Sequence, residues 1–270
     1  QGCQSEGSRV RGIGRYSMNL IKAFIHLFPK EEYILFANAF LFDLRDEFKD
    51  ELTNEVLNIF YFKWYPISPT SSNFIENSDL IALSTELRSY AISMLGADIF
   101  LITSFFEGYV DNCLTAVDFS YPLPISVSIL YDLIPLINPE TYLNSNPLFN
   151  IFYRHKIEEL KKLDYLFAIS NSALREGVEY LGTSENKITN ISSACDTKKF
   201  CETKDTLDSS KNNFSIGGDF ILYTGAGDPR KNLYRLLEAY SLLPPNLICK
   251  YKLVLAGKLI PEEIDLILRI

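Results

Sequence analysis

Short apolar runs of strand length alternate with amphipathic segments along this chain, and that alternation limits the folds open to it. The runs lie at 33–37, 56–62, 98–102, 125–131, 165–169, 187–191, 219–224 and 251–256. Strands that are apolar at successive positions are buried on both faces, as in parallel sheets covered by helices on either side. The sequence therefore predicts an α/β fold built on parallel sheets.

The expected helices are recognised by apolar residues at three- and four-residue steps. They lie at 16–28, 42–52, 78–95, 148–163 and 233–243, with one more running from the Ser170 cap to Leu181. In the helix at 78–95, Leu80, Leu83 and Leu87 form the apolar face. Gly96 and Gly182 follow their helices at the positions where C-capping glycines stand.

A change in composition divides the chain. Residues 201–218 are rich in Lys, Asp, Ser, Asn and Gly, which is typical of a linker. We expect 1–200 to form one α/β domain whose first strand is missing, because the polar opening segment resembles a loop that follows a strand. Residues 219–270 are too few for most domains to fold alone, so we expect them to be the incomplete start of a second domain.

Charge and cysteine usage exclude several classes of protein. The formal net charge of -8 disfavours binding to nucleic acid. The five cysteines form no C-x-x-C pair, and no signal-like segment opens the chain, so reduced thiols in a cytoplasmic protein are expected. His26 and His155 are too far apart in the sequence for a local metal motif, so no metal site is predicted. The charged run at 154–156 indicates a solvated helix face.

The first candidate site is the loop that opens the first helix. In open parallel sheets, ligands bind on the loops that follow the strands. Gly12 and Gly14 allow backbone N–H groups to approach an anion at the positive end of a helix dipole. Ser17 stands where a dinucleotide-binding fingerprint has its third glycine. The alternative is a tight turn without a ligand.

A second strand–loop–helix junction carries two adjacent cations, Arg230 and Lys231. Cations at the start of a helix oppose its dipole, so their placement favours a bound anion between them and the helix. Arginine binds phosphate in a bidentate manner and lysine binds it as a point charge. The alternative is a pair of solvated surface cations.

Two further loops present carboxylates after strands. Tyr131 and Asp132 follow the run at 125–131, and Asp132 could orient a substrate hydroxyl. Glu107 stands among aromatic residues after the run at 98–102, a composition that resembles a carbohydrate-contact surface. The alternative for Asp132 is an ordinary loop aspartate without a ligand, and the alternative for Glu107 is a surface carboxylate beside aromatic rings of the core.

Four segments together resemble the family 4 glycosyltransferases, particularly bacterial surface-polysaccharide mannosyltransferases. They are RGIGRY at 11–16, YDLIPL at 131–136, LFAISNSA at 166–173 and GDPRKN at 227–232. Their order and spacing match over nearly the whole chain. The resemblance implies the GT-B architecture of two Rossmann-like domains, with the acceptor side in the first and the nucleotide sugar in the second. It also implies transfer of a hexose from a nucleotide-diphosphate sugar to a saccharide or lipid-linked acceptor, with retention and without a metal.

The resemblance assigns roles residue by residue. Gly12, Arg230 and Lys231 are expected to bind the donor diphosphate, with the cations able to face the glycine loop. Asp132 and Tyr131 are expected at the catalytic position, where Tyr131 replaces the histidine that many members carry. Arg15 and Glu107 are expected on the acceptor side. The resemblance also implies a cytoplasmic protein that associates peripherally with the inner face of the membrane. It implies no cofactor.

Two alternatives remain at this point. A dinucleotide-binding oxidoreductase would need the third glycine, and titration with NAD against a GDP- or UDP-sugar would separate it from a glycosyltransferase. The other is a truncated glycosyltransferase that acts as a binding module. Both ends of the chain read as interrupted, so we expect residues 1–270 by themselves to transfer little or no sugar.

Overall fold

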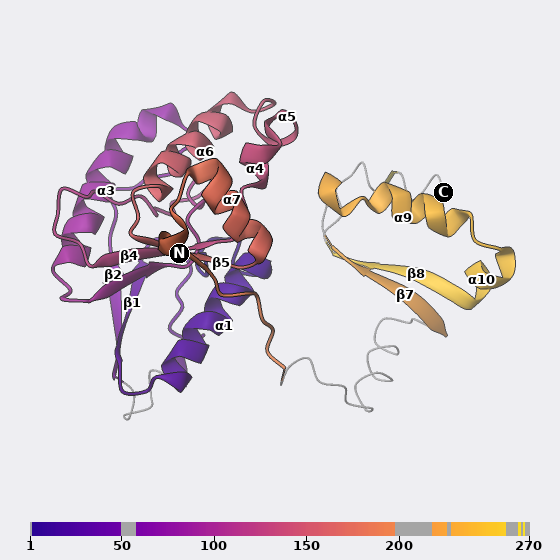
Figure 1. Cartoon of the computed structure of the whole chain (residues 1–270), viewed down its shortest axis with the longest axis horizontal. Helices are drawn as coiled ribbons and strands as arrows, with labels where there is room; N and C mark the ends of the chain where they lie inside the picture. Colours follow the sequence, from indigo (N-terminus) through magenta and orange to yellow (C-terminus); the bar gives the residue numbers. More distant parts are fainter. Residues whose placement is uncertain are drawn as a thin grey trace. The chain divides into compact units, whose positions relative to one another are not determined.

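The protein, a computed structural model, divides into two compact units, Gln1–Thr197 and Lys198–Ile270 (Figure 1). The structure describes residues 2–49, 58–197, 218–225, 228–257, 264, 265 and 267. The predicted linker at 201–218 lies, apart from Gly218, outside the described residues.

The first unit contains two parallel sheets. Strand β1 (Glu32–Asn38) pairs with β2 (Asn58–Trp64), and a four-stranded sheet has the order β3-β4-β5-β6. These strands are β3 (Ile99–Ile102), β4 (Ile125–Leu130), β5 (Tyr165–Ala168) and β6 (Ile188–Asn190). All their pairings are parallel, as the apolar runs predicted.

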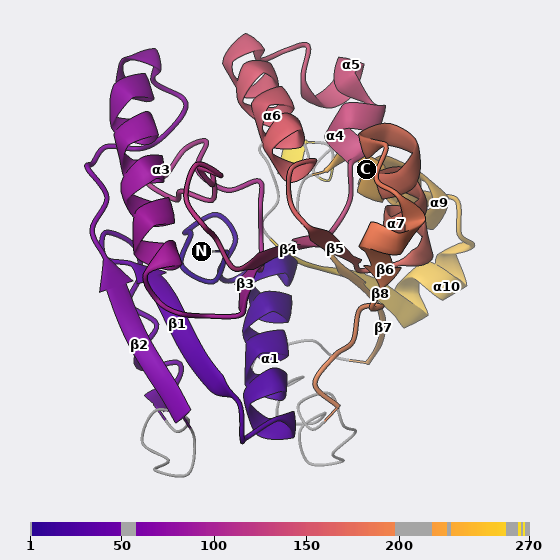
Figure 2. The same ribbon diagram turned by 60° about the vertical axis from the view of Figure 1, so that its left-hand side comes forward.

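Helices cover both faces of the four-stranded sheet. In Figure 2, α1 (Gly12–Leu27) lies on one side, and α6 (Pro147–Leu160) and α7 (Asn171–Leu181) lie on the other. Helices α3 (Ser78–Ser93), α4 (Ile134–Ile137) and α5 (Pro139–Tyr142) also belong to this unit. The predicted stops are confirmed, because Gly96 and Gly182 have positive φ angles of 66° and 70°. Ser170 caps α7 by accepting a hydrogen bond from the Ala173 N–H at 3.1 Å.

The core lies between β4, β5 and α6. Strand β4 is buried at every position after its first. Its two serines are fully covered, yet both are satisfied: Ser128 Oγ donates to Ile102 O at 3.2 Å, and Ser126 Oγ donates to Asp164 Oδ2 at 2.7 Å. Buried polar groups that keep their partners cost little, so the strand tolerates serine in its interior.

Helix α3 faces the protein with a different side from the one predicted. Leu83 and Leu87 are about half exposed, whereas Ser84, Arg88 and Ser89 are buried. These polar side chains bind backbone that the sequence pattern cannot indicate. Arg88 Nη1 donates to Ala116 O at 2.7 Å, and Ser89 Oγ accepts from the Asp118 N–H at 2.8 Å.

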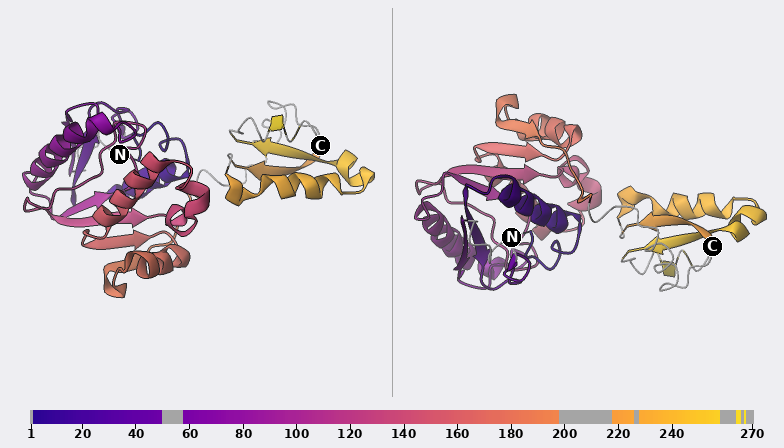
Figure 3. Two further views of the ribbon diagram at one scale, coloured as in Figure 1. Left: turned by 90° about the horizontal axis from the view of Figure 1, so that it is seen from above. Right: turned by 90° about the horizontal axis from the view of Figure 1, so that it is seen from below.

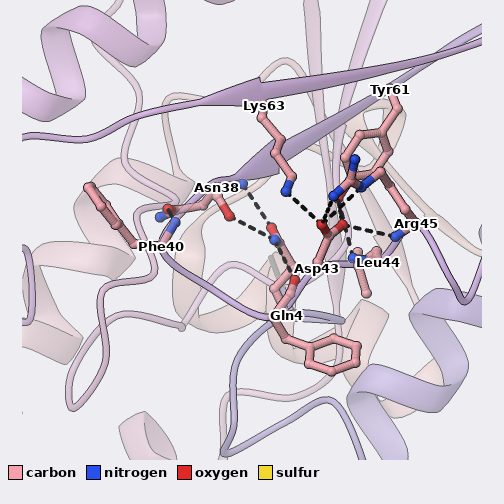
Figure 4. Close-up of polar contacts among 9 residues, drawn as sticks. Gln4, Asn38, Phe40, Asp43, Leu44, Arg45, Tyr61 and Lys63 are labelled. Carbon is pink, nitrogen blue, oxygen red and sulfur yellow. Dashed lines mark hydrogen bonds and ion pairs between the residues drawn. The ribbon is translucent and has the colours of Figure 1, made fainter.

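The helix predicted at 42–52 is wrong for its first part, since residues 42–44 have no regular structure and residues 45–48 form turns. The carboxylate of Asp43 accepts a hydrogen bond from the Arg45 N–H at 3.1 Å, a local contact that competes with helix formation. It also binds the Arg45 guanidinium, Tyr61 Oη and Lys63 Nζ (Figure 4). Asp43 therefore fixes this turn to β2. Residues 50–52 lie outside the described part.

The second unit, as far as it is described, is a parallel pair of strands with helices alongside. Strand β7 (Asp219–Thr224) pairs with β8 (Tyr251–Ala256), and α9 (Leu233–Ser241) lies along one face of the pair (Figure 3). Helix α10 (Pro245–Lys250) leads into β8. Leu233 and Leu237 of α9 are buried, as its apolar spacing predicted.

The contacts of Asp43, above all the hydrogen bond from Arg45, hold the pKa of its carboxyl well below the usual range. A carboxyl whose pKa is lowered in the folded state contributes stability above the pH at which the unfolded chain protonates, about 4, and loses it as the pH falls further. We therefore expect Asp43→Asn to be less stable than the natural chain at pH 7, and the difference to shrink between pH 5 and pH 2.

Urea denaturation across that pH range measures the difference. Asp46→Asn, at an exposed position on the same turn, is the matched control and should leave the pH dependence unchanged. A stability difference for Asp43→Asn that stays constant down to pH 2 would show that these contacts do not stabilise the ionised carboxylate.

Candidate functional site

The loop at 2–11 folds back over the first turn of α1. The Gly14 N–H donates to Ser8 O at 3.1 Å, and a Cβ on Gly14 would stand 2.4 Å from both Ser8 O and Arg9 Cα. Only glycine fits so close an approach of backbone. Gly14 is thus required by packing, whereas a Cβ on Gly12 would meet nothing within 4 Å.

The start of α1 has no side-chain cap. Arg11 stands at the N-cap position without a capping side chain, and the first turn contains no acidic residue. The first N–H groups of a helix have no partner within it, so those of Gly12 and Ile13 mark a positive end suited to an anion. Gly12 and Arg15 are both exposed here.

Tyr131 binds α1 to the end of β4. Its hydroxyl donates to Ile13 O at 3.3 Å and lies 3.0 Å from Ser17 Oγ, and its ring meets Tyr16 edge to face. Burial is the largest cause of a raised pKa for Tyr131, so the hydroxyl stays neutral and can donate. Ser17 is fully buried and bonds Thr103 O at 3.2 Å, which makes it a packing residue.

Glu107 lies beside the opening loop. Ser104 Oγ donates to Glu107 Oε1 at 2.7 Å. A Cβ on Gly2 would come within 2.6 Å of Ser104 Cβ and 3.6 Å of Glu107 Oε1, so this glycine lets the loop pass close to the carboxylate. The negative charge of Glu107 is also among the causes of the raised pKa of Tyr131. The structure thus brings Glu107 and Tyr131, two predicted site residues, into one neighbourhood.

Asp132 lies among residues of α6 and α7. Its Oδ1 accepts from the Ile134 N–H at 3.2 Å, while the Leu133 N–H donates to Glu176 Oε2 at 2.8 Å. The pKa of Tyr153 is raised first by burial and then by the charges of Asp132 and Glu176. Sequence reasoning missed Glu176, because the contact joins positions 43 residues apart and leaves no local pattern.

A buried cation supports the loop that carries Glu107. Lys156 is 5% exposed, so the solvated face predicted at 154–156 holds for the exposed Arg154 and His155 and is wrong for Lys156. Its Nζ donates to Thr115 Oγ1 at 2.9 Å and pairs with Glu159 at 3.2 Å, while Thr115 Oγ1 donates to Phe105 O. Burial lowers the pKa of Lys156. A buried charge survives only when it is paired and bonded, so this cluster ties α6 firmly to the loop.

The two cations of the second unit stand before their helix and not in its first turn. They belong to a 3-10 turn, Pro229–Lys231, and α9 begins at Leu233. Arg230 is held by Asp228, with Nη2 2.7 Å from Oδ2. Asp228 thus offsets one of the two charges at this junction. Lys231 is exposed.

The described part of the chain offers neither a metal-binding cluster nor a helix able to span a membrane. It contains no cluster of three or more His, Cys, Asp or Glu side chains that could hold a metal ion. No helix there combines the length and apolar character needed to cross a bilayer.

The contrast between the two glycines gives a test of the site's geometry. We expect Gly14→Ala to lower the free energy of unfolding by about 1–3 kcal/mol, the usual cost of overpacking, because its methyl group meets backbone. Gly12→Ala should unfold at the temperature of the natural chain. Thermal denaturation followed by circular dichroism measures both variants, and equal unfolding temperatures for the two would refute this packing of the loop.

Serotype-specific mannosyltransferases named WbdA, from Escherichia coli, are similar to this chain. One is 35% identical over 278 residues, covering 100% of the chain and 32% of the relative. Another is 36% identical over 231 residues, covering 84% of the chain and 28% of the relative. The chain therefore spans about a third of the length of these relatives or less. No family model matches it.

Solved structures show the same fold. HepE of Anabaena in complex with UDP superposes with a TM-score of 0.51 at 13% identity, covering 94% of this chain and 60% of HepE. Its complex with UDP-glucose gives a TM-score of 0.53 at 12% identity. The predicted α/β fold class of the GT-B type is confirmed. The chain thus resembles bacterial mannosyltransferases over its whole length, as its four sequence segments indicated.

Proposed function

We propose that the protein containing this chain transfers a hexose, mannose, from a nucleotide-diphosphate sugar to a hydroxyl of a saccharide or lipid-linked acceptor. The observation that carries the proposal is the 35% identity to WbdA mannosyltransferase over the entire chain. Transfer with retention, in the synthesis of a cell-surface polysaccharide, is part of the proposal. So is a cytoplasmic location with peripheral attachment at the inner face of the membrane.

The turn at Pro229–Lys231 is proposed to bind the leaving diphosphate. Negative charge on that group grows as the glycosidic bond breaks, so cations placed beforehand stabilise the transition state more than the bound donor. Asp228 supports this role because it holds the Arg230 guanidinium at 2.7 Å and thereby limits its rotamers. The exposed Lys231 adds a point charge. We invoke no metal for charge neutralisation.

The loops of the first unit are proposed to contact the sugar and the acceptor. The uncapped start of α1, with Gly12, offers N–H groups to an anionic oxygen of the donor. Asp132 offers a carboxylate acceptor to sugar hydroxyls, and Tyr131, whose hydroxyl binds Ile13 O, holds the start of α1 beside it. Glu107 and Arg15 are proposed to contact the acceptor.

Substitution of the two cations tests the proposal. In the full-length protein, Arg230→Ala and Lys231→Ala should each lower kcat about a hundredfold, the loss typical when one group that stabilises a transition-state anion is removed. The KM for the donor should change much less. The measurement is transfer of radiolabel from GDP-mannose, with UDP-glucose as the competing donor, to an oligomannoside acceptor.

Arg235→Ala is the matched control, because Arg235 is an exposed cation on α9 outside the turn. It should transfer mannose at the natural rate. If kcat is unchanged in both Arg230→Ala and Lys231→Ala, the diphosphate does not bind at this turn. If the natural protein transfers sugar from no nucleotide sugar, the proposed activity is wrong.

A further inference from the structure

A pocket of about 290 Å³ opens between three loops of the first unit, apart from the residues proposed above for the reaction. The opening loop contributes residues around Glu6 and Arg9, the turn after β1 contributes Phe40 and Phe42, and the loop after β3 contributes Asp111. The volume is close to the lower limit of small-molecule sites, about 300 Å³. It suits one monosaccharide unit of a longer chain.

Buried polar side chains hold the floor of this pocket. Gln4 Nε2 donates to both Asn38 O and Phe42 O at 2.9 Å, and Gln4 Oε1 accepts from the Asn38 N–H at 2.9 Å (Figure 4). Asn38 Nδ2 then donates to Asn112 O at 2.8 Å. Gln4 is 2% exposed and Asn38 is 0% exposed. These bonds join the opening loop to the end of β1 and to the turn that follows it, and join the end of β1 to the loop after β3, so the three loops are fixed relative to one another before any ligand arrives.

The walls of the pocket leave aromatic faces in contact with water. Phe40 is 53% exposed and Phe42 is 38% exposed. The Arg9 guanidinium lies over the Phe42 ring, 4.0 Å from its centroid, and Phe40 packs edge to face against Tyr65. Neighbouring exposed aromatic rings on a rigid floor are typical of a contact surface for a ligand or partner.

The polar groups at the rim distinguish among ligands. The side chains of Glu6 and Arg9 form no hydrogen bond or ion pair with any other residue that the structure describes, so both can bind a ligand. Two carboxylates, Glu6 and Asp111, stand beside the one guanidinium, which disfavours phosphate and other anions. A neutral ligand with apolar C–H faces and many hydroxyls fits both the rings and the rim.

We propose that this pocket is a saccharide subsite that binds the acceptor glycan away from the sugar that receives the new residue. One sugar ring stacks on Phe40 and Phe42, and its hydroxyls bind Glu6, Arg9 and Asp111. The inference rests on the proposed function, since it takes the acceptor to be a saccharide. Rigid loops reduce the ordering cost of binding, so a weak stacking contact becomes useful.

The same two loops connect this subsite to Glu107. On the loop after β3, Asp111 follows Glu107 by four positions. On the opening loop, Gly2 packs against Ser104 beside Glu107, and Ser5 Oγ donates to Asp111 Oδ2 at 2.5 Å. A glycan that lies along the opening loop therefore meets both places.

The test is a calorimetric titration of the full-length protein with α-linked mannotriose, without donor, followed by transfer kinetics. Phe40→Ala and Arg9→Ala should each weaken mannotriose binding about tenfold and raise the acceptor KM to a similar extent. The donor KM and kcat should stay as in the natural protein. Inorganic phosphate should not compete with mannotriose.

Phe28→Ala is the matched control, because Phe28 is 52% exposed at the other end of α1. It should bind mannotriose normally. Weaker binding by Phe40→Ala in a protein that transfers no mannose would support the subsite and overturn only the proposed function. Equal affinities for the natural protein, Phe40→Ala and Arg9→Ala would overturn the subsite. So would loss of self-association in Phe40→Ala without any change in mannotriose affinity.

Discussion

The close approach of the opening loop to the first helix holds the candidate site together. Ser8 O accepts the Gly14 N–H where no side chain fits, and Gln4 joins the same loop to the turn after β1. The loop also passes Ser104 at Gly2, beside Glu107. Three segments far apart in the sequence are thereby fixed at one edge of the unit.

The loop after β3 depends on an ionic support of a different kind. Lys156 and Arg88 are both buried. Lys156 donates a hydrogen bond to Thr115 Oγ1, which in turn donates to Phe105 O, and Arg88 donates to the backbone oxygens of Thr115 and Ala116. Burial lowers the pKa of Arg88 to about 10. Removing Glu159 would leave Lys156 buried without its counter-charge, which is costly. The support thus gives Glu107 a fixed position in a segment with no regular secondary structure.

The strands were predictable from the sequence because burial on both faces favours continuous apolar runs, as in β5. Side-chain contacts between distant segments could not be predicted from the sequence. Gly12 and Gly14 look equivalent in the motif, yet only Gly14 meets backbone. Lys156 was placed in solvent by its charged neighbours, and Leu83 and Leu87 were taken as the packed face of α3. In both cases the deciding partner is the loop at 103–118, whose path has no local signature in the sequence.

The central claim is that a nucleotide sugar binds at the two strand–loop–helix junctions, and amide hydrogen exchange of the full-length protein tests it most directly. With GDP-mannose bound, the claim predicts slower exchange at 11–16 and 228–233, where backbone N–H groups and the Arg230–Lys231 turn would contact the diphosphate. Exchange in β1 and β2 should not change. If saturating GDP-mannose changes the exchange rate at neither junction, or slows exchange only in other segments, the account is contradicted.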